Sequence, residues 1–438
     1  MQFKIQKGNG LKGEINVPGD KSISHRSIML ASLADGRSEI SGFLEGEDCL
    51  ATIEVFQKMG VNISRHEGVF IVEGKGLKAL EEPSSPLDFK NSGTSVRLCS
   101  GVLSAQEFSS TLTGDSSLSS RPMDRITEPL RLMGASISSK EGGTLPIKIE
   151  PVNFLKSIKY SLPVASAQVK SCLLFAGLYS NGDLEIEEKV TTRDHTERML
   201  KQYGIPIGIS QSKGTKLIKL NKVEVINPTN ISICGDFSSA SFFILAALIT
   251  PNSELLLKNV GVNPTRIGFL HALRHMGANI ELQNTKDLFE PTADILVRTS
   301  NLKGITLNTD LVANMIDEMP AFFIAASLAE GITKVKNAKE LRMKESDRLQ
   351  VMSEALDSFG VKFLLEDDAI TINGIGKTGT FKNAVINSYG DHRIAMASSI
   401  GSLRSDGESS VLDCLNVNTS FPNFIEVCKE VGINIQEV

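Results

Sequence analysis

The sequence lacks the patterns that mark membrane-bound and exported proteins. No run of about 18 uncharged apolar residues occurs in its 438 residues, so it predicts no transmembrane helix. The first residues, MQFKIQKGNG, lack the basic and then apolar segments of an export or transit signal. We therefore expect a soluble, cytoplasmic protein that does not bind membranes.

Cysteines are few and scattered. None of the six belongs to a CxxC pair, and none has a histidine neighbour at metal-ligand spacing. This pattern is typical of reduced thiols in a reducing compartment, and it indicates no metal site. The six residues are Cys49, Cys99, Cys172, Cys234, Cys414 and Cys428.

A basic excess and aromatic stacking residues are also lacking. The formal net charge is -5, and the chain has no tryptophan and four tyrosines beside 20 phenylalanines. Nucleic-acid binding needs a basic face or exposed aromatic rings, so no nucleic-acid partner is expected. The phenylalanines are expected to fill the core, and any anionic ligand must be held by a local cluster of cations.

What the chain does contain is an internal repeat. Its length predicts two large domains or three smaller ones, and its 41% hydrophobic residues can bury a large core. Six similar phrases, from FQKMGVNI to CKEVGINI, each end a helical pattern with a glycine and then begin a strand pattern. These glycines recur every 70 to 83 residues and suit the C′ position of a helix. They are Gly60, Gly134, Gly204, Gly277, Gly360 and Gly432.

Each repeat has a second helical pattern that is apolar on nearly every face, which is typical of a buried helix. Examples are SSASFFILAALITPN and MPAFFIAASLAEG. The helix before each glycine is amphipathic and is expected to lie outside, and β-branched segments such as GEINV and ILVRT supply strands. The repeat therefore predicts an α/β (α+β) fold in which three units surround their inner helices to make one domain.

The chain is expected to cross between two such domains at two similar segments, VPGDKS at 17–22 and ICGDFSS at 233–239. Both place a Gly-Asp pair directly before a buried helix. One domain would comprise 21–235, and the other would combine 1–20 with 236–438. A continuous solenoid is the alternative, but repeats this long with fully buried helices pack poorly in a row.

The N-termini of the expected inner helices are rich in cationic and hydroxyl residues. The first reads PGDKSISHR at 18–26, and others begin KNSGT at 90–94, ASAQ at 165–168 and YGDHR at 389–393. Free backbone N–H groups and the positive end of the helix dipole make such termini anion sites. Several of them together would hold a strongly charged ligand.

The run LRMKESDR at 341–348 adds further charges. On one continuous helix, Lys344 and Arg348 would share a face beside Glu345. Two cations next to a carboxylate suit an anion site with acid–base chemistry. The alternative is an exposed helix that carries surface ion pairs.

These segments together resemble the EPSP synthase family of enolpyruvyl transferases. The matching signatures follow one another along the whole chain. They are PGDKSISHR (18–26), KNSGTSVRL (90–98), SSRPMD (119–124), ASAQVKS (165–171), IDEMP (316–320), LRMKESDR (341–348) and YGDHRIAMA (389–397). The resemblance implies a two-domain inside-out α/β barrel built from six βαβαββ repeats, three per domain, with the active site in the cleft between the domains.

The resemblance also implies a reaction. The family transfers the enolpyruvyl group of phosphoenolpyruvate to the 5-hydroxyl of shikimate 3-phosphate and releases phosphate by addition and elimination. Both small-molecule substrates carry a phosphate and a carboxylate, which arginine forks and lysine point charges suit. The resemblance implies no cofactor and no metal, and a monomer is expected.

Residue roles follow from the resemblance position by position. The implied catalytic residues are Asp317, Glu345, Lys21 and Lys344. Asp317 would deprotonate the attacking hydroxyl, and Glu345 would protonate the methylene carbon. The implied substrate-binding residues are Lys21, Ser22, Arg26, Asn91, Gly93, Thr94, Arg121, Ser166, Ala167, Gln168, Asp317, Lys344, Arg348 and Arg393. The domain at 21–235 would bind mainly shikimate 3-phosphate, and the other would contribute phosphoenolpyruvate-binding and catalytic residues.

Other polar residues have simpler interpretations. Asp391 and His392 suit a helix cap and a buried pair, and Asp48 suits the start of a helix rather than an acid with a catalytic task. Arg97 and Arg342 are expected to support the site without contacting substrate.

The chain departs from the family pattern at a few positions. Thr419 stands where many members carry a lysine that closes over the ligand, and Ala167 follows Ser166 where some members have a second serine. Ala167 would then bind substrate only through its backbone, because it lacks the serine hydroxyl. Gly93 is retained, which predicts inhibition by glyphosate, a mimic of phosphoenolpyruvate.

Three alternatives are weaker. An enolpyruvyl transferase acting on UDP-N-acetylglucosamine would have an asparagine at Ser22 and a reactive cysteine in the segment GDSSLSSRP, which has none. An RNA 3′-phosphate cyclase would need a nucleotide-reactive histidine and a basic surface. A non-catalytic anion-binding relative would not be expected to keep Asp317, Glu345 and Lys344 together.

Overall fold

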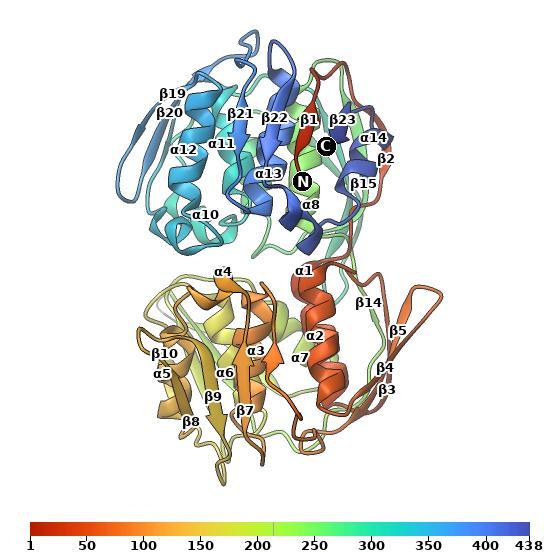
Figure 1. Cartoon of the computed structure of the whole chain (residues 1–438), viewed down its shortest axis with the longest axis vertical. Coiled ribbons are helices and arrows are strands. Elements are labelled where there is room, and N and C mark those ends of the chain that lie inside the picture. Colours follow the sequence, from red (N-terminus) through yellow and green to blue (C-terminus); the bar gives the residue numbers. More distant parts are fainter. Residues whose placement is uncertain (213) are drawn as a thin grey trace. The chain divides into compact units, whose positions relative to one another are not determined.

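The computed structural model describes residues 1–212 and 214–438, which form two compact units (Figure 1). Unit 1 combines Met1–Pro18 with Cys234–Val438, and unit 2 is Gly19–Ile233. These limits lie two residues before the crossings expected at 20/21 and 235/236. The chain therefore begins in unit 1, builds all of unit 2, and returns to complete unit 1.

The described residues of unit 2 form three sheets, each made of four strands. The first has the order β14 (Ile231–Ser232), β3 (Asp35–Ser41), β5 (Val69–Lys75) and β4 (Asn62–His66). The second has the order β6 (Leu87–Asp88), β7 (Ser110–Thr113), β9 (Thr144–Glu150) and β8 (Ser136–Lys140). The third has the order β10 (Lys159–Ser161), β11 (Leu184–Glu188), β13 (Thr215–Leu220) and β12 (Ile207–Ser212).

Unit 1 repeats this plan. Its sheets have the orders β16 (Asn279–Lys286), β17 (Thr292–Arg298), β15 (Glu254–Gly261), β2 (Lys12–Ile15); and β21 (Val385–Asn387), β22 (Ser409–Leu412), β1 (Phe3–Ile5), β23 (Ile435–Glu437). The remaining sheet has three strands, β18 (Glu330–Val335), β20 (Ile370–Ile375) and β19 (Lys362–Leu365). Isolated parallel bridges from Lys303 and Thr306 to β18 take the place of its fourth strand.

Strand pairing explains why the chain crosses between units twice. Each four-stranded sheet has one parallel pair at one edge and antiparallel pairs elsewhere, and a parallel pair needs a long crossover connection. In the first sheet of unit 2 the opening strand is β14, which comes from the end of that unit and pairs with β3. In unit 1, β2 from the N-terminal segment pairs with β15 in the same way. Each unit is thus closed by a strand distant in sequence.

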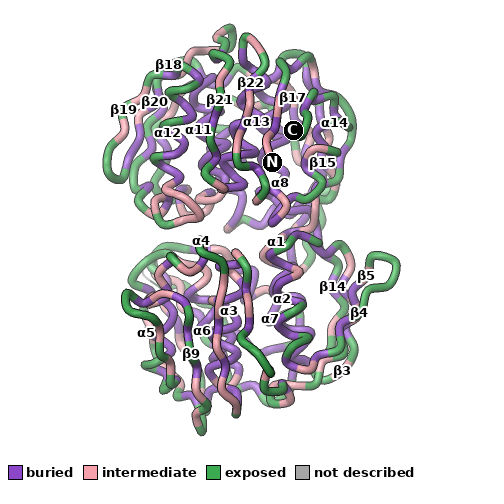
Figure 2. The backbone as a smooth tube through the Cα atoms, in the orientation of Figure 1, coloured by how far each residue is buried: buried purple, intermediate pink, exposed green. Residues whose placement is uncertain are grey.

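Two kinds of helix accompany the sheets. The inner helices are α1 (Lys21–Leu33), α3 (Gly93–Leu103), α6 (Ala167–Gly177), α8 (Phe237–Ile249), α11 (Met319–Ser327) and α13 (His392–Gly401). The second helices are α2 (Glu47–Lys58), α5 (Asp124–Leu132), α7 (His195–Gln202), α9 (Gly268–His275), α12 (Arg348–Ser358) and α14 (Phe424–Glu430). Every residue of α8 and α11 is buried, as their apolar sequences predict (Figure 2).

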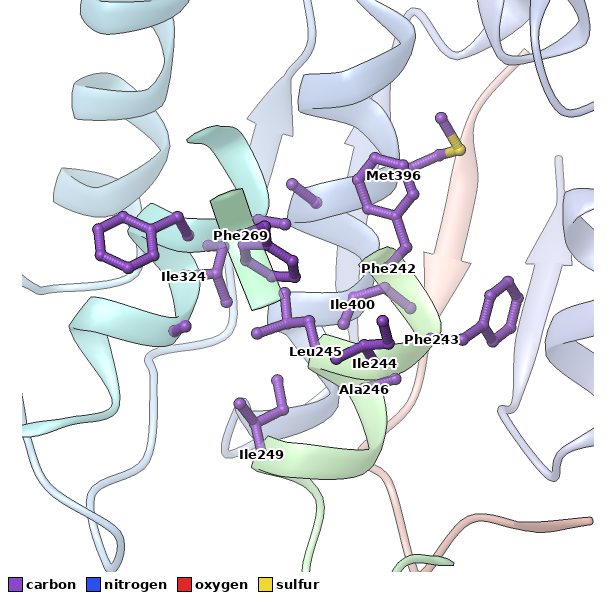
Figure 3. Packing of buried hydrophobic residues seen from close by; sticks show 14 of the residues in the cluster. Phe242, Phe243, Ile244, Leu245, Ala246, Ile249, Phe269, Ile324, Met396 and Ile400 are labelled. Carbon is purple, nitrogen blue, oxygen red and sulfur yellow. The ribbon is translucent and has the colours of Figure 1, made fainter. Parts of the chain in front are cut away.

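Close packing of the inner helices forms the core of each unit. In unit 1, Ile324 of α11 and Ile400 of α13 lie beside side chains of α8 such as Leu245 (Figure 3). In unit 2, a Cβ added at Gly101 of α3 would lie 2.2 Å from the carbonyl oxygen of Cys172 on α6. Only glycine permits this approach of two helix backbones.

The repeat glycines behave as the sequence predicts. All six have positive φ, between 74° and 95°, directly after the second helix of each repeat. All six cysteine side chains are buried thiols, and no helix among the described residues is both long and apolar enough to cross a bilayer.

One expected helix is wrong. The run at 341–348 is not continuous, because a short 3-10 helix (Lys339–Met343) ends before Lys344, whose backbone is extended, and α12 begins at Arg348. Asp347 caps α12 by accepting the N–H of Gln350 at 3.0 Å, which fixes the new helix start. Lys344 and Arg348 are therefore not one helical turn apart.

Candidate functional site

In unit 2, the start of α1 carries three of the predicted residues. Asp20 caps the helix by accepting the N–H of Ile23 at 2.8 Å, and Lys21 and Ser22 form its first turn. Lys21 Nζ lies 2.5 Å from Asp48 Oδ2 at the start of α2. Asp48 was interpreted as a helix-start residue only, and the structure shows that it also holds the lysine.

Arg26 lies one turn further along α1 and is buried. Its Nη1 donates to the carbonyl of Ser22 at 2.9 Å, while Nε and Nη2 donate to the hydroxyls of Thr196 and Ser171 at 2.7 and 2.8 Å. Burial lowers the pKa of Arg26 to about 10, and the like charge of Arg193 acts in the same direction. These three hydrogen-bond partners, two hydroxyls and a backbone carbonyl, are neutral, so they do not neutralise the guanidinium charge.

The start of α3 brings Asn91, Gly93 and Arg121 together. Arg121 follows the short helix α4 (Ser116–Ser119), is buried, and donates to Asn91 Oδ1 at 2.7 Å. A Cβ at Gly93 would lie 2.9 Å from Arg97 Nη1 and 3.1 Å from Arg121 Nη1. Gly93 therefore leaves the space that these two guanidinium groups occupy.

The start of α6 joins the same cluster. Ser166 caps this helix by accepting the N–H of Val169 at 3.4 Å, and Ala167 is its first residue. Gln168 Nε2 donates to Thr94 Oγ1 on α3 at 3.1 Å, and Gln168 Oε1 accepts from Arg97 at 2.8 Å. Arg97 therefore helps to hold the side chain of Gln168.

Unit 1 carries a compact group of charges around Arg348. This side chain is fully buried at the start of α12, and it donates to Asp317 Oδ1 at 3.1 Å, Glu345 Oε2 at 2.5 Å and Asp391 Oδ2 at 2.8 Å. Burial disfavours the charged form, but the three carboxylates outweigh it, so the pKa of Arg348 lies above its ordinary value. The predicted acid and base are therefore held by one guanidinium.

The backbone around Asp317 is anchored by its neighbour. Glu318 is completely buried, accepts a hydrogen bond from the Ser238 hydroxyl of α8, and pairs with Arg266 at 3.4 Å.

Arg393, in the first turn of α13, also contacts Asp317. Its Nε lies 3.6 Å from Asp317 Oδ1, and its Nη1 donates to the Asp317 carbonyl at 3.3 Å.

Lys344 completes the group in unit 1. Burial lowers the pKa of its ammonium below the ordinary value of 10.5, and the positive charge of Arg348 lowers it further. Asp317 and Glu345 act in the opposite direction but do not compensate. Lys344 is therefore a cation that can lose its charge at a lower pH than an exposed lysine.

Sequence reasoning gave Asp391 a smaller part than the structure does. Its carboxylate caps α13, as expected, by accepting the N–H of Arg393 at 2.9 Å, but it also binds Arg348.

Two other positions singled out in the sequence lie in unit 1. Thr419, which stands where many family members carry a lysine, is buried, and its hydroxyl donates to the Asn416 carbonyl at 2.7 Å. Arg342 pairs with Asp347 at 2.7 Å, next to the start of α12.

Comparisons with known proteins agree on one family. The model of EPSP synthase (3-phosphoshikimate 1-carboxyvinyltransferase) matches residues 5–428. Curated relatives named 3-phosphoshikimate 1-carboxyvinyltransferase include those of Hydrogenovibrio crunogenus, 48% identical over 100% of this chain and 99% of that protein, and Methylococcus capsulatus, 48% identical over 99% and 98%.

Solved structures show the same relationship. An EPSP synthase from Acinetobacter baumannii is 46% identical, covers 99% of each chain and superposes with a TM-score of 0.87. The enolpyruvyl transferase NikO from Streptomyces tendae, at 14% identity over 100% of this chain and 98% of that one, has a TM-score of 0.79 and shares the fold. The match over nearly the whole length, together with the predicted signatures, establishes that this chain belongs to the EPSP synthase family.

Proposed function

We propose that this chain transfers the enolpyruvyl group of phosphoenolpyruvate to the 5-hydroxyl of shikimate 3-phosphate, yielding 5-enolpyruvylshikimate 3-phosphate and phosphate. Its family membership and the names of relatives about 48% identical over their full lengths support this reaction. The product belongs to the biosynthesis of chorismate and the aromatic amino acids. We propose that residues of both units act on the same two substrates.

The observation that carries the proposal is the pairing of Asp317 and Glu345 through Arg348. A hydroxyl that adds to an alkene carbon needs a base, and the methylene carbon needs an acid at the same time. Two carboxylates held on one buried guanidinium are fixed in their relative positions, which is what two coordinated proton transfers require.

In the proposed addition step, Glu345 gives a proton to the methylene carbon of phosphoenolpyruvate, and C2 becomes cation-like. Asp317 takes the proton of the substrate hydroxyl as its oxygen bonds to C2, which gives a tetrahedral ketal phosphate. In the elimination step, Glu345, now a carboxylate, takes a proton back from the new methyl group as the C–O bond to phosphate breaks. Lys21 and Lys344 stabilise the negative charge on the leaving phosphate.

The binding roles are proposed for the residues grouped above. Shikimate 3-phosphate would contact Ser22, Arg26, Ser166, the backbone of Ala167, and Gln168. Phosphoenolpyruvate would contact Lys21, Asn91, Gly93, Thr94, Arg121, Gln168, Lys344, Arg348 and Arg393. The hydrogen bonds from Arg121 to Asn91 and from Gln168 to Thr94 support these groupings, because they fix the donors before substrate arrives.

Phosphate release by the purified protein with both substrates tests the reaction. We expect turnover by the wild type, and a loss of about 100- to 10,000-fold in kcat for Asp317→Ala, because the base is removed. Lys21→Ala should lose activity in the same range through the leaving phosphate.

Asp367→Ala is the matched control, because this exposed carboxylate pairs with Lys339 at the surface of unit 1 and should leave turnover unchanged. Absence of turnover by the wild type would refute the reaction. Full activity of Asp317→Ala would refute the role of that residue while leaving the reaction in place.

A further inference from the structure

Unit 2 contains a buried ionic cluster that the proposed mechanism does not use. Lys170 Nζ on α6 lies 2.9 Å from Glu188 Oε1 on β11 and 2.8 Å from Glu197 Oε1 on α7, and all three side chains are inaccessible to solvent. Lys216 Nζ on β13 lies 3.7 and 3.5 Å from the same two glutamates. Two lysines and two glutamates balance one another, so the cluster has no net charge.

A pair of hydroxyls lies directly beside this cluster. Ser171 follows Lys170 on α6, and Thr196 precedes Glu197 on α7. The two hydroxyl oxygens are 2.7 Å apart, and the neighbouring ion pair joins Lys170 to Glu197. The two helices are therefore cross-linked twice, by one hydroxyl contact and one ion pair on successive residues.

The hydroxyl pair holds Arg26. Thr196 accepts from Nε at 2.7 Å and Ser171 accepts from Nη2 at 2.8 Å, so the two oxygens grip one edge of the guanidinium. With the bond from Nη1 to Ser22, the described contacts use three of the five N–H donors of Arg26. The remaining donors belong to Nη1 and Nη2, which form the end of the guanidinium and suit two oxygens of an anion.

Neutral partners have a chemical advantage at this position. A carboxylate would orient the guanidinium equally well, but it would also compete with an anionic substrate for the charge. Two carboxylates, Asp20 and Glu197, are close enough to Arg26 to favour its charged form, and Asp20 is already held as the cap of α1. Lys170 offsets Glu197, and the hydroxyls keep the contact with Arg26.

We propose that Thr196 and Ser171 are positioning residues for Arg26, and that Lys170 keeps Glu197 from capturing the guanidinium. This inference rests on the proposed contact between Arg26 and shikimate 3-phosphate. Because that contact is a binding contact, its loss should raise the KM of one substrate and leave kcat nearly unchanged.

Thr196→Val tests the hydroxyl grip, because it removes the hydroxyl and keeps the shape. We expect the KM for shikimate 3-phosphate to rise roughly ten-fold, as for a hydrogen bond to a charged group, with kcat and the KM for phosphoenolpyruvate within about two-fold of wild type. Thr196→Ser should restore the wild-type KM. Ser171→Ala provides a second variant with the same expected change in KM.

Two comparisons separate positioning from general damage. Ser100→Ala is the matched control, since this buried hydroxyl on α3 donates to the Val96 carbonyl of its own helix and should not change the KM. In an Arg26→Ala background, Thr196→Val should have no further effect on binding, because the hydroxyl acts through the guanidinium. A full additional loss in that background would overturn the proposal.

The charge argument has its own test. Lys170→Met should raise the KM for shikimate 3-phosphate, because Glu197 then keeps only the more distant Lys216 as a partner and can turn toward Arg26. Adding Glu197→Gln should reverse most of this rise, since Lys216 and Glu188 still balance each other. A double variant no better than Lys170→Met would overturn the role of Lys170.

The outcomes also separate this inference from the proposed function. The dissociation constant of shikimate 3-phosphate, measured by calorimetry without the second substrate, gives the same comparison without turnover. If the wild type turns over and Arg26→Ala weakens binding but Thr196→Val does not, positioning fails and the function stands. If Arg26→Ala leaves binding unchanged, the contact and the positioning fail together, while the reaction is judged by phosphate release.

Discussion

Arg348 Nε lies 2.8 Å from Asp391 Oδ2, and both side chains are completely buried. Asp391 also caps α13 by accepting the N–H of Arg393. One carboxylate thus fixes the guanidinium that holds Asp317 and Glu345, and it fixes the start of the helix that carries Arg393. The proposed acid and base and Arg393 therefore depend on this pair for their relative positions.

Asp391→Asn should therefore impair both stability and activity. The change leaves Arg348 buried with one carboxylate fewer, and we expect the free energy of unfolding to fall by about 3 kcal/mol. Displacement of Asp317 and Glu345 should lower kcat about 100-fold. Urea unfolding and phosphate release measure the two effects.

Glu254→Gln is the control for this prediction, because its ion pair with Arg298 in unit 1 is exposed. Breaking such a surface pair should cost less than about 1 kcal/mol. Equal losses of stability in the two variants would contradict the central position given to Asp391.

Gly93→Ala should weaken phosphoenolpyruvate binding selectively. The new Cβ would lie within 3.1 Å of Nη1 of both Arg97 and Arg121, so the guanidinium groups must shift. We expect the KM for phosphoenolpyruvate to rise about ten-fold and the KM for shikimate 3-phosphate to change little. Steady-state kinetics with each substrate varied in turn measures the difference.

Gly208→Ala is the matched control, because the nearest atom that a Cβ would meet at this exposed strand position is 3.9 Å away. It should leave both KM values unchanged. A rise in the KM for shikimate 3-phosphate alone in Gly93→Ala would place this glycine beside the other substrate.

The sequence was most informative where structure depends on local chemistry. The six repeat glycines could be recognised because a helix C′ position with positive φ needs glycine whatever surrounds it. The inner helices could be recognised because α8 and α11 are apolar on every face. Both signals lie within a few neighbouring residues.

Partners distant in the chain could not be predicted in this way. Asp391 lies 43 residues from Arg348, and an aspartate before a helix is already explained as a cap. The contact between Asp48 and Lys21 could not be predicted for the same reason, because the place of Asp48 at the start of α2 already explains an aspartate there. The break before α12 was missed because a helical spacing of charges gives no indication that Asp347 starts a new helix.

Glyphosate should inhibit the wild-type protein at sub-millimolar concentration, in competition with phosphoenolpyruvate and not with shikimate 3-phosphate. Arg121, whose guanidinium lies beside Gly93, suits the anionic groups that both compounds share. Gly93→Ala should reduce the inhibition by moving this cation. Inhibition measured at several concentrations of each substrate checks the pattern, and indifference at millimolar glyphosate would contradict it.

The lowered pKa of Lys344 has opposite consequences for stability and activity. In the unfolded chain this lysine has its ordinary pKa of 10.5, and in the folded protein burial lowers it. Between the two values the unfolded state binds more protons, so the contribution of Lys344 to stability rises with pH in that window. The proposed contact with substrate, by contrast, needs the charged ammonium, so we expect binding to weaken as pH rises through the lowered pKa of Lys344.

Lys344→Arg should therefore move the alkaline limb of the pH profile. An arginine keeps its charge where Lys344 loses it, so kcat/KM for phosphoenolpyruvate should fall at a higher pH than in the wild type, even if its maximum is lower. Profiles from about pH 7 to about pH 10 measure the shift. Lys339→Arg, an exposed position in the same segment, should leave the limb in place. An unchanged limb in Lys344→Arg would mean that another group, such as Arg26 with its pKa of about 10, sets the alkaline limit.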